Sequence, residues 1–473
     1  YFYQYSIMYH KVSSEDIDFF VDLLADRCLF SQEKKEKYSS DETEDLSYPP
    51  ELVLKPKTSE EISKILSYCN KKLIPVTPAG ARTGLSGGAL AIHGGILLSM
   101  ELFNKILKID EDNYQVITEP GVITEDLQNS LKEKGLFYPP DPASKGSCFI
   151  GGNVAENSGG PKAVKYGVTS DYVLNLEVVL ATGEIIWTGA NVLKNATGYN
   201  LTQLMVGSEG TLGIVTKIVL KLIPHPTRDM LMLVPFFEAE EACKAVAAIF
   251  NAGITPSGLE FMERDALLLS QQMIDNSTIS IKDKHQAHLL IESDGFEEGI
   301  IMAECEKIMH VLENFKTDEI LFAENEAQKS ALWALRRKVG EAVKSKSIYK
   351  EEDTVVPRYA LPELLKEVKS IGNDFGFESI CYGHAGDGNL HVNILKGDLS
   401  DEKWEKELPK AIKKLFIKVK SLGGTLSGEH GIGLVQKQYM EIFFSKSTIF
   451  MMKNIKKIFD PNLILNPGKI FPD

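Results

Sequence analysis

The sequence predicts an α+β protein whose two main parts differ in their pattern of strands, helices and glycines. From about Tyr48 to Pro226, short strand-like runs and helices alternate with many glycines, and two pairs of runs are spaced as β-hairpins. From about Thr227, apolar strand-like runs alternate with helices, a pattern typical of an antiparallel sheet backed by helices. The hairpins argue against a doubly wound parallel sheet, because parallel strands need long crossover connections.

The first 47 residues are expected to form a helical lead-in. Ser13 and Asp16 have the spacing of a capping box, and apolar residues recur at helical spacing from Ile17 to Leu24. The polar and charged run Ser31–Asp45 predicts a mobile loop. A more compact unit should begin at Tyr48.

That unit, residues 48–226, is expected to open with a helix that starts at Thr58 and Glu61, followed by a strand over residues 73–78. Two hairpins are predicted further on: Ile106–Ile109 with Tyr114–Thr118, and Val173–Leu180 with Glu184–Trp187.

Three glycine-rich loops punctuate the same unit, Ala79–Gly88, Gly151–Gly160 and Gly207–Gly213. Glycine lets backbone N–H groups approach and surround an anion, although a single loop of this kind is more often an ordinary turn. None has the spacing of a Rossmann or P-loop motif. Three of them in one unit indicate a long, phosphate-bearing ligand.

Residues 227–422 are predicted to form a second unit, and residues 423–473 a C-terminal segment. Two strands are expected over residues 230–237 and 288–293. Helices are expected at Glu240–Ala252, Gly299–Phe315, Gln328–Lys346, Leu361–Phe375 and Asp401–Leu422, the last broken or kinked at Pro409.

The stretch Cys381–Leu395 predicts a hairpin that carries two imidazoles. If Asp387 and Gly388 form a two-residue turn, His384 faces His391 across the strands, close enough to share one divalent metal. Glu429, in the glycine-rich run Gly423–Gly433, would complete a site of two histidines and one carboxylate. The alternative is a purely structural pair of histidines.

The 473 residues include 52 basic and 66 acidic side chains, a net charge of −14, which argues against nucleic acid or an anionic membrane as the main partner. Six single cysteines without close spacing favour a reducing compartment. No apolar run is long enough to span a membrane. We therefore expect a cytoplasmic location, with peripheral attachment to the inner membrane left open.

From about Tyr48 to its end, the chain resembles the flavin-linked 2-hydroxy-acid dehydrogenases and glycolate-oxidase-type subunits, within the group that shares the vanillyl-alcohol-oxidase FAD fold. The motifs that carry this resemblance are PAGARTGLSGGA (Pro78–Ala89), EPGV (Glu119–Val122), YPPDPAS (Tyr138–Ser144), GGNVAENSGGPKAVKYGVTSDYVLNLEVVLATGE (Gly151–Glu184), KNATGYNLTQLMVGSEGTLGIVT (Lys194–Thr216), GHAGDGNLH (Gly383–His391), SGEHGIG (Ser427–Gly433) and NPGK (Asn466–Lys469).

The resemblance implies a two-subdomain FAD-binding domain of the PCMH type, an antiparallel α+β cap domain, and a helical C-terminal segment that returns to the flavin. It implies FAD held non-covalently, because the first loop has neither the His nor the Cys of covalently flavinylated relatives. The FAD contacts that it assigns are Gly80, Ala81, Arg82, Thr83, Gly84, Gly87, Gly88, Pro120, Asp141, Ser144, Gly151, Gly152, Asn153, Asn157, Ser158, Gly159, Tyr166, Gly167, Ile214 and Asn466.

In the metal-containing branch of the family, the matching positions make His384, His391 and Glu429 ligands of a divalent ion, of which Zn, Mn and Fe are the candidates. His430 would stand beside the flavin as a catalytic residue. The branch also places an Arg after a Trp-x-Leu stretch on the substrate carboxylate, here Arg336, with Arg337 and Arg358 as weaker candidates.

Two departures from that branch concern the substrate. Gly340 stands where some members have Thr, and Lys350 is displaced from the position of a substrate-binding Lys. They leave the flavin site untouched.

The implied activity is oxidation of a small D-2-hydroxy acid, such as D-lactate, glycolate or a D-2-hydroxyglutarate-like acid, to the 2-oxo acid. As a hypothesis, Arg336 pairs with the carboxylate, the metal lowers the pKa of the 2-hydroxyl, and His430 takes its proton as hydride passes to the flavin. Electrons would pass to an electron-transfer flavoprotein, a quinone or an iron–sulfur subunit, not to NAD. A homodimer is left open.

Two alternatives remain at this point. One is an FAD-binding subunit of a multi-subunit oxidase with little activity alone, which the intact His384, His391, Glu429 and His430 argue against. The other is a non-redox alkyl-transfer flavoenzyme of the same fold, whose run of consecutive histidines is absent here.

Overall fold

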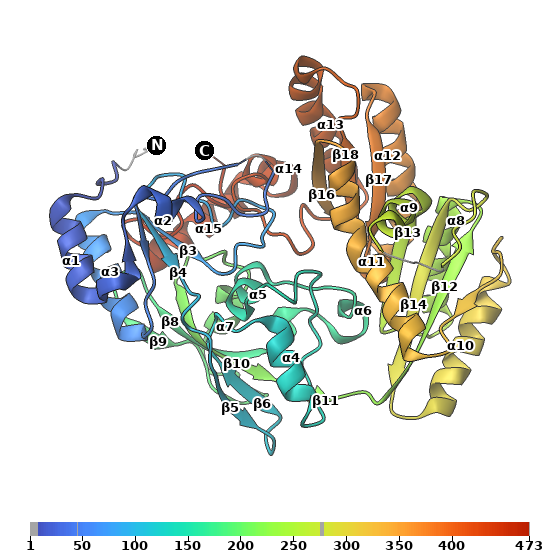
Figure 1. The fold of residues 1–473 in the computed structure, drawn as a ribbon, viewed down its shortest axis with the longest axis horizontal. Helices are drawn as coiled ribbons and strands as arrows, with labels where there is room; N and C mark the ends of the chain where they lie inside the picture. Colours follow the sequence, from blue (N-terminus) through green and yellow to red (C-terminus); the bar gives the residue numbers. More distant parts are fainter. Residues whose placement is uncertain (1–7, 45, 275–278, 473) are drawn as a thin grey trace.

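The computed structural model describes residues 8–44, 46–274 and 279–472, which form two lobes (Figure 1). One lobe holds a four-stranded and a five-stranded sheet, and the other holds a single seven-stranded sheet. Helices cover the sheets, as expected for an α+β fold. The division of the chain near residues 48, 227 and 423 stays a prediction.

The N-terminal segment begins with the predicted helix, α1 (Ser14–Leu24). Ser13 and Asp16 form both hydrogen bonds of the capping box. The segment Ser31–Asp45 was predicted to be a mobile loop, and this was wrong for the five residues that form a short helix, α2 (Gln32–Glu36). Tyr38 is buried, and the Thr43 hydroxyl accepts a hydrogen bond from the Gly87 N–H at 2.7 Å. Asp45 lies outside the described residues.

The four-stranded sheet has the order β1-β2-β4-β3, and its strands are short and mostly apolar. The strands are β1 (Cys28–Leu29), β2 (Leu52–Leu54), β3 (Val76–Ala79) and β4 (Ile96–Ser99). One face is covered by α1 and by α3 (Ser59–Lys72), whose apolar stripe joins the same core. The Thr58 hydroxyl caps α3 by accepting from the Glu61 N–H, as the sequence predicted.

The five-stranded sheet is antiparallel, in the order β5-β6-β10-β8-β9, and contains both predicted hairpins. Its strands are β5 (Ile106–Asp110), β6 (Gln115–Thr118), β8 (Val173–Val179), β9 (Ile185–Trp187) and β10 (Ile214–Lys221). The helices α4 (Thr124–Lys132), α5 (Ile150–Glu156) and α7 (Leu201–Met205) contribute to its core. Smaller elements between them are β7 (Leu136–Phe137), α6 (Ala163–Tyr166) and β11 (Ile223–Pro224).

The seven-stranded sheet of the second lobe is antiparallel throughout, in the order β15-β12-β14-β13-β17-β18-β16. Its strands are β12 (Arg228–Phe236), β13 (Gly258–Glu263), β14 (Ala287–Gly295), β15 (Leu321–Phe322), β16 (Tyr349–Val355), β17 (Glu378–Gly383) and β18 (Asn389–Leu395). Both faces are buried, which explains why β12 is apolar almost without interruption: Met232 and Val234 face one core and Leu231 and Leu233 the other.

Helices cover both faces of this sheet (Figure 1). On one face lie α8 (Ala239–Asn251), α10 (Glu298–Leu312), α12 (Leu361–Phe375) and α13 (Asp401–Ser421), and on the other α9 (Arg264–Gln272) and α11 (Glu326–Lys346). The predicted break of the helix at Pro409 was wrong, because α13 continues through it.

The imidazole hairpin exists, but its predicted turn was wrong. Instead of a two-residue turn, residues 385–387 form a 3₁₀ turn that Gly388 closes at φ +86°. Tyr382, not His384, is therefore the cross-strand partner of His391. Because the register differs from the predicted one by two residues, an even number, the same side chains still face the same side of the sheet.

The C-terminal segment returns to the first lobe through α14 (Met440–Phe443) and α15 (Lys446–Phe459) (Figure 1). The Val76 N–H donates to the Ile464 carbonyl, and the Asn466 N–H donates to the Val76 carbonyl, both at 2.8 Å. The end of the chain thus pairs with β3, the strand that leads into the first glycine-rich loop.

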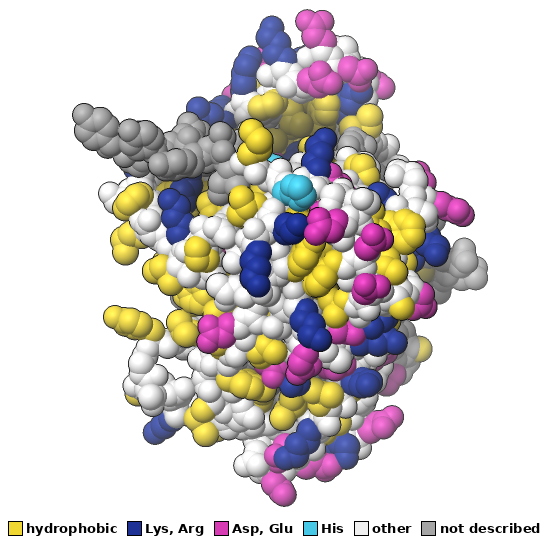
Figure 2. Space-filling view, turned by 90° about the vertical axis from the view of Figure 1, so that its left-hand side faces the viewer, with side chains coloured by type: hydrophobic (Ala, Val, Ile, Leu, Met, Phe, Trp, Pro, Cys, Tyr) yellow, Lys and Arg dark blue, Asp and Glu magenta, His cyan; other side chains and the backbone are white. Residues whose placement is uncertain are grey.

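The surface carries charges of both signs. On the face shown in Figure 2, Lys and Arg side chains lie among Asp and Glu side chains, with hydrophobic side chains scattered between them. Within the described ranges, no helix is long and apolar enough to cross a membrane. All six cysteines are buried and free of disulfides.

Candidate active site

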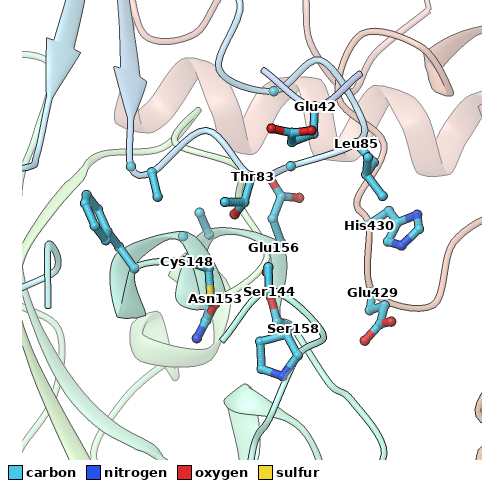
Figure 3. A pocket seen from close by; sticks show the side chains of 18 of the residues that line it. Glu42, Thr83, Leu85, Ser144, Cys148, Asn153, Glu156, Ser158, Glu429 and His430 are labelled. Atoms are coloured by element: carbon cyan, nitrogen blue, oxygen red, sulfur yellow. The ribbon is translucent and has the colours of Figure 1, made fainter. Parts of the chain in front are cut away.

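A cavity of about 710 Å³ is lined by residues of both lobes. The first lobe contributes the loops after β3 and around α5, and the second contributes α11, the β16–β18 region and the loop that carries Glu429 and His430. Figure 3 shows Thr83 and Asn153 on one side of this cavity and His430 and Glu429 on another.

The glycine-rich wall leaves room for a ligand. A Cβ atom added at Gly84 or Gly152 would meet no atom within 4 Å, and both residues line the cavity. Gly151 differs, because a Cβ there would lie 2.5 Å from Pro120 Cβ. The absent side chains at Gly84 and Gly152 therefore make space for a ligand, as expected for a long molecule that lies against exposed backbone.

Most of the predicted cofactor residues line this cavity. They are Gly80, Ala81, Arg82, Thr83, Gly84, Gly88, Pro120, Asp141, Ser144, Gly151, Gly152, Asn153, Ser158 and Ile214. The others, Gly87, Asn157, Gly159, Tyr166, Gly167 and Asn466, lie behind the cavity wall.

Several residues behind the wall hold its loops in place. The Asn466 amide donates to the carbonyls of Gly88 and Glu209, at 2.9 and 2.8 Å, and so joins two glycine-rich loops. The Tyr166 hydroxyl donates to Asp294 Oδ1 at 2.6 Å and connects the two lobes. Asn157 adopts a left-handed conformation at φ +57° and accepts from the Ser170 N–H.

The predicted metal ligands converge on one point. His384 Nε2 lies 3.2 Å, and His391 Nε2 3.6 Å, from the same Glu429 Oε1 atom. One donor atom from each residue lies within 4.8 Å of the other two. Two imidazole nitrogens and a carboxylate oxygen at this spacing fit a divalent transition metal with open positions for water or substrate.

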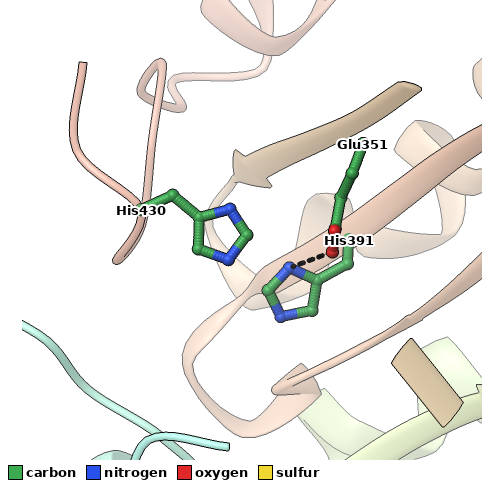
Figure 4. Close-up of side chains that lie close together, drawn as sticks. All are labelled: Glu351, His391 and His430. Carbon is green, nitrogen blue, oxygen red and sulfur yellow. Dashed lines mark ion pairs between the residues drawn. The ribbon is translucent and has the colours of Figure 1, made fainter. Parts of the chain in front are cut away.

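Each histidine has a carboxylate behind it. His384 Nδ1 lies 2.9 Å from both oxygens of Glu260. His391 Nδ1 lies 3.7 Å from Glu351 Oε1, as Figure 4 shows, and 3.7 Å from Asp353 Oδ1. A carboxylate at Nδ1 favours the tautomer whose Nε2 lone pair is free for a metal. His384 is thus oriented as a metal-binding histidine usually is, whereas the 3.7 Å contacts of His391 Nδ1 are too long for hydrogen bonds and orient its ring by charge alone.

Glu351, His391 and His430 form a second close group, shown in Figure 4. It uses the opposite nitrogen of His391, and the His391 and His430 rings stack at a centroid distance of 5.2 Å and an angle of 18°. One neutral imidazole offers a single lone pair, so His391 cannot bind a metal through both ring nitrogens. We therefore interpret Glu351 and His430 as residues that support His391 from outside the metal site.

Buried charges shift the acidities of these groups. Burial alone would raise the pKa of Glu429, but His384 and His391 lower it to about 2. Burial lowers the pKa of His391 to about 4, so its ring is neutral at pH 7. Burial would also lower the pKa of His384, yet Glu260 and Glu429 raise it well above the ordinary value. The carboxylates around His384 thus create a negative potential that favours a cation there, either a proton or a divalent metal.

Two carboxylates position the loop that carries Glu429 and His430. Asp353 Oδ2 accepts from the N–H groups of Gly428, Glu429 and His430 at 2.8 to 3.0 Å, and from a nearby serine hydroxyl. Glu209, from the first lobe, accepts from the N–H groups of Ile432 and Gly433. The loop is thus fixed from both lobes.

Arg336 lies in the cavity wall on α11 and is buried, with its guanidinium 5.3 Å from the centre of the Tyr382 ring. Its Nε donates to Glu260 Oε2 at 2.7 Å. Arg337 also lines the cavity and lies over the Trp333 ring. Arg358 does not line it, because its guanidinium donates to the Gly386 carbonyl and lies over Phe250.

The displaced Lys350 pairs with Glu44 and does not line the cavity. Lys344 lines it instead, two turns beyond Arg336 on α11, and its Nζ lies 3.1 Å from Glu351 Oε2. Gly340 lies between them on the same helix face. The cavity thus holds a lysine from α11 in place of Lys350, and this lysine has an internal carboxylate partner.

Comparison with known proteins identifies the family. Residues 225–470 match the family "FAD linked oxidases, C-terminal domain", and residues 50–189 match the family "FAD binding domain". The chain belongs to the FAD-linked oxidases. It is an oxidoreductase, and FAD is the long phosphate-bearing ligand that the glycine-rich loops predicted.

Relatives of this FAD-linked oxidase match it over most of their length. A D-lactate dehydrogenase of Anaerostipes hadrus is 38% identical over 98% of both chains. Glycolate oxidase subunit GlcD of Bacillus subtilis is 41% identical, and a D-2-hydroxyglutarate dehydrogenase of Xanthomonas citri pv. viticola is 35% identical, each over 92% of both chains. Among solved structures, p-cresol methylhydroxylase has the same fold at a TM-score of 0.79 and 17% identity, covering 97% of this chain and 96% of its own.

Several cavity residues of this FAD-linked oxidase have no counterpart among the sequence predictions. Asp41 and Glu42 line the cavity from the segment that was predicted to be a mobile loop. Glu156, Glu209, Lys344, Glu351 and Tyr382 also line it, and Glu260 and Asp353 support it from behind. Glu260 and Asp353 are buried carboxylates within strands, and their partners lie far away in the sequence, so no local pattern marked them.

Proposed function

We propose that this FAD-linked oxidase oxidises a small 2-hydroxy carboxylate of the D configuration, with the help of a divalent metal, to the 2-oxo acid. The observation that carries the proposal is the convergence of His384 Nε2, His391 Nε2 and Glu429 in the cavity that Arg336 also lines. An arginine suits the carboxylate and a metal suits the adjacent hydroxyl. The three relatives named above act, by their names, on D-lactate, glycolate and D-2-hydroxyglutarate.

The side chains divide the work between binding and proton transfer. Arg336 binds the carboxylate, and His384, His391 and Glu429 would hold a metal that polarises the 2-hydroxyl. His430 stands beside this centre to take the hydroxyl proton. Although burial opposes it, Asp353, Glu351 and Glu429 raise the pKa of His430, which makes its ring a stronger proton acceptor. Bound FAD supplies the oxidising power.

The electron acceptor belongs to the same proposal. We expect an electron-transfer flavoprotein, a quinone or an iron–sulfur subunit. One relative is named as a subunit of glycolate oxidase, which favours the second candidate function, an FAD-binding subunit that needs a partner for full turnover. The chain also shares its fold with alkyldihydroxyacetonephosphate synthase, at a TM-score of 0.73 and 17% identity, but it lacks the run of consecutive histidines expected of that chemistry.

Anaerobic stopped-flow mixing with a panel of hydroxy acids tests the proposal. We expect D-lactate, glycolate or D-2-hydroxyglutarate to bleach the flavin absorbance within seconds, and the L enantiomers to be much slower. Bleaching followed by slow reoxidation without a partner would favour the subunit. A flavin that no hydroxy acid reduces would contradict the proposal.

FAD should be bound non-covalently. The cavity-lining thiol of Cys148 lies 3.3 Å from the Thr124 hydroxyl, and burial raises its pKa, so the nucleophilic thiolate is disfavoured. Acid precipitation of the yellow protein should release all flavin into the supernatant. Colour that stays in the pellet would contradict this, and Cys148→Ser would then show whether the thiol forms the bond.

A further inference from the structure

A single buried carboxylate joins the two groups that would bind substrate and metal. Glu260, on β13 in the interior of the seven-stranded sheet, is 0% exposed. Its Oε2 atom accepts from Arg336 Nε at 2.7 Å, and both of its oxygens lie 2.9 Å from His384 Nδ1. Nothing in the sequence pattern pointed to it.

The contacts of Glu260 leave the cavity side of Arg336 and the Nε2 atom of His384 available for substrate and metal. Arg336 turns its Nε and Nη2 edge toward Glu260 Oε2, at 2.7 and 2.6 Å, which leaves the Nη1 group for a ligand in the cavity that Arg336 lines. His384 turns its Nε2 toward Glu429. One carboxylate therefore holds an anion receptor and a metal ligand at a fixed separation.

We propose that Glu260 is a positioning residue that sets the spacing between the carboxylate-binding Arg336 and the metal ligand His384, and thereby selects 2-hydroxy over 3-hydroxy acids. The inference rests on the proposed function. In a 2-hydroxy acid the hydroxyl-bearing carbon is bonded directly to the carboxylate carbon, whereas a 3-hydroxy acid inserts one methylene. A rigid pair of receptors discriminates between these lengths, and a loosened pair does not.

Glu260 is suited to this task because its own position is fixed. Its strand pairs with β14 on one side and β17 on the other, and Glu260 lies opposite Leu290. His384 directly follows β17, and Arg336 belongs to the helix packed on the same sheet face. The bridge thus ties together three elements of the second lobe.

The test compares Glu260→Gln with Glu263→Gln. The second variant is a matched control, because Glu263 lies on the same strand and is largely buried, but its carboxylate accepts from Lys369 and the Cys381 N–H, away from the cavity. Flavin content and absorbance report folding. Metal affinity is measured by chelator competition with Zn²⁺ and Mn²⁺, and kcat/KM is measured for D-2-hydroxybutyrate and D-3-hydroxybutyrate.

Glu260→Gln should weaken metal binding about 10- to 100-fold, raise the KM for the 2-hydroxy acid, and lower the preference for the 2-hydroxy over the 3-hydroxy acid at least about tenfold. Glu263→Gln should match the parent protein. Wild-type metal affinity together with unchanged preference in Glu260→Gln would overturn the proposal. If Glu260→Gln does not fold, Glu260→Asp takes its place, because this variant keeps the charge but is too short to reach both partners. Unchanged metal affinity together with unchanged preference in Glu260→Asp would likewise overturn the proposal.

Failure of the proposed function would look different. The parent protein would then oxidise no hydroxy acid, while the metal affinities of Glu260→Gln and Glu263→Gln would still differ if Glu260 positions His384.

Discussion

Replacing any one of His384, His391 or Glu429 by alanine is expected to remove the metal and hydroxy-acid oxidation together, while FAD stays bound. Three protein ligands leave no spare donor, so the loss of one should abolish tight binding. The glycine-rich loops that line the cofactor side of the cavity belong to the first lobe, and none of the three proposed ligands belongs to them. Elemental analysis beside flavin absorbance measures both outcomes in one sample.

His430→Ala is the matched control for this prediction. Its ring stacks on His391, but its neighbours Glu351 and Asp353 would still orient His391. The variant should keep metal and FAD and lose about 10²- to 10⁴-fold in rate, the usual contribution of a general base. Metal retained by both His384→Ala and His391→Ala would instead show the pair to be structural.

The hairpin shows how far the sequence could lead. The Asp-Gly pair located a hairpin, and the predicted pairing of its strands brought His384 and His391 to one face. The turn itself was mispredicted, because Gly388 closes a longer 3₁₀ turn with its N–H bonded to Ala385, and a Cβ at Gly388 would lie 1.9 Å from the Val356 carbonyl oxygen. A contact with another strand, invisible in local sequence, decided the turn.

Tertiary contacts also explain the other failures. The charged run after Ser31 lacks a periodic apolar pattern, yet Tyr38 is buried and Thr43 binds the Gly87 N–H. Pro409 leaves α13 unbroken because it lies on the exposed side, where the carbonyl that loses its partner, at Glu405, can bind water. Local sequence propensity predicts secondary structure poorly where a tertiary contact stabilises the segment or where water binds a backbone group that has lost its partner.

The sequence predicted only those site residues whose side-chain type and family motif indicate a metal or carboxylate site. The histidines, Glu429 and Arg336 have side chains typical of metal and carboxylate sites, and family motifs marked them. Glu260, Asp353 and Glu209 act through hydrogen bonds to segments that lie far away in sequence, such as the Asp353 carboxylate under residues 427–430. The spacing of residues along the chain does not reveal such long-range hydrogen bonds.

Arg336→Met is expected to raise the KM for the hydroxy acid about 10- to 150-fold while FAD content is unchanged. The estimate follows from a charge-assisted contact worth about 1.5–3 kcal/mol. The substitution keeps an unbranched side chain in the buried position on α11, and Glu260 keeps its contact with His384. Steady-state kinetics and flavin absorbance on the same preparations measure both effects.

Arg337→Met is the control that separates the two neighbouring arginines. Arg337 also lines the cavity, but it is exposed and lies over Trp333, and no carboxylate in the described part of the chain fixes it as Glu260 fixes Arg336. When a carboxylate already fixes one edge of a guanidinium, the other edge loses less conformational freedom on binding a substrate carboxylate bidentately. We therefore expect the KM of Arg337→Met to stay within about threefold of the parent value on this argument. The reverse result, a normal KM in Arg336→Met and a raised one in Arg337→Met, would move the substrate carboxylate to the exposed arginine, and the spacing role of Glu260 would fall with it.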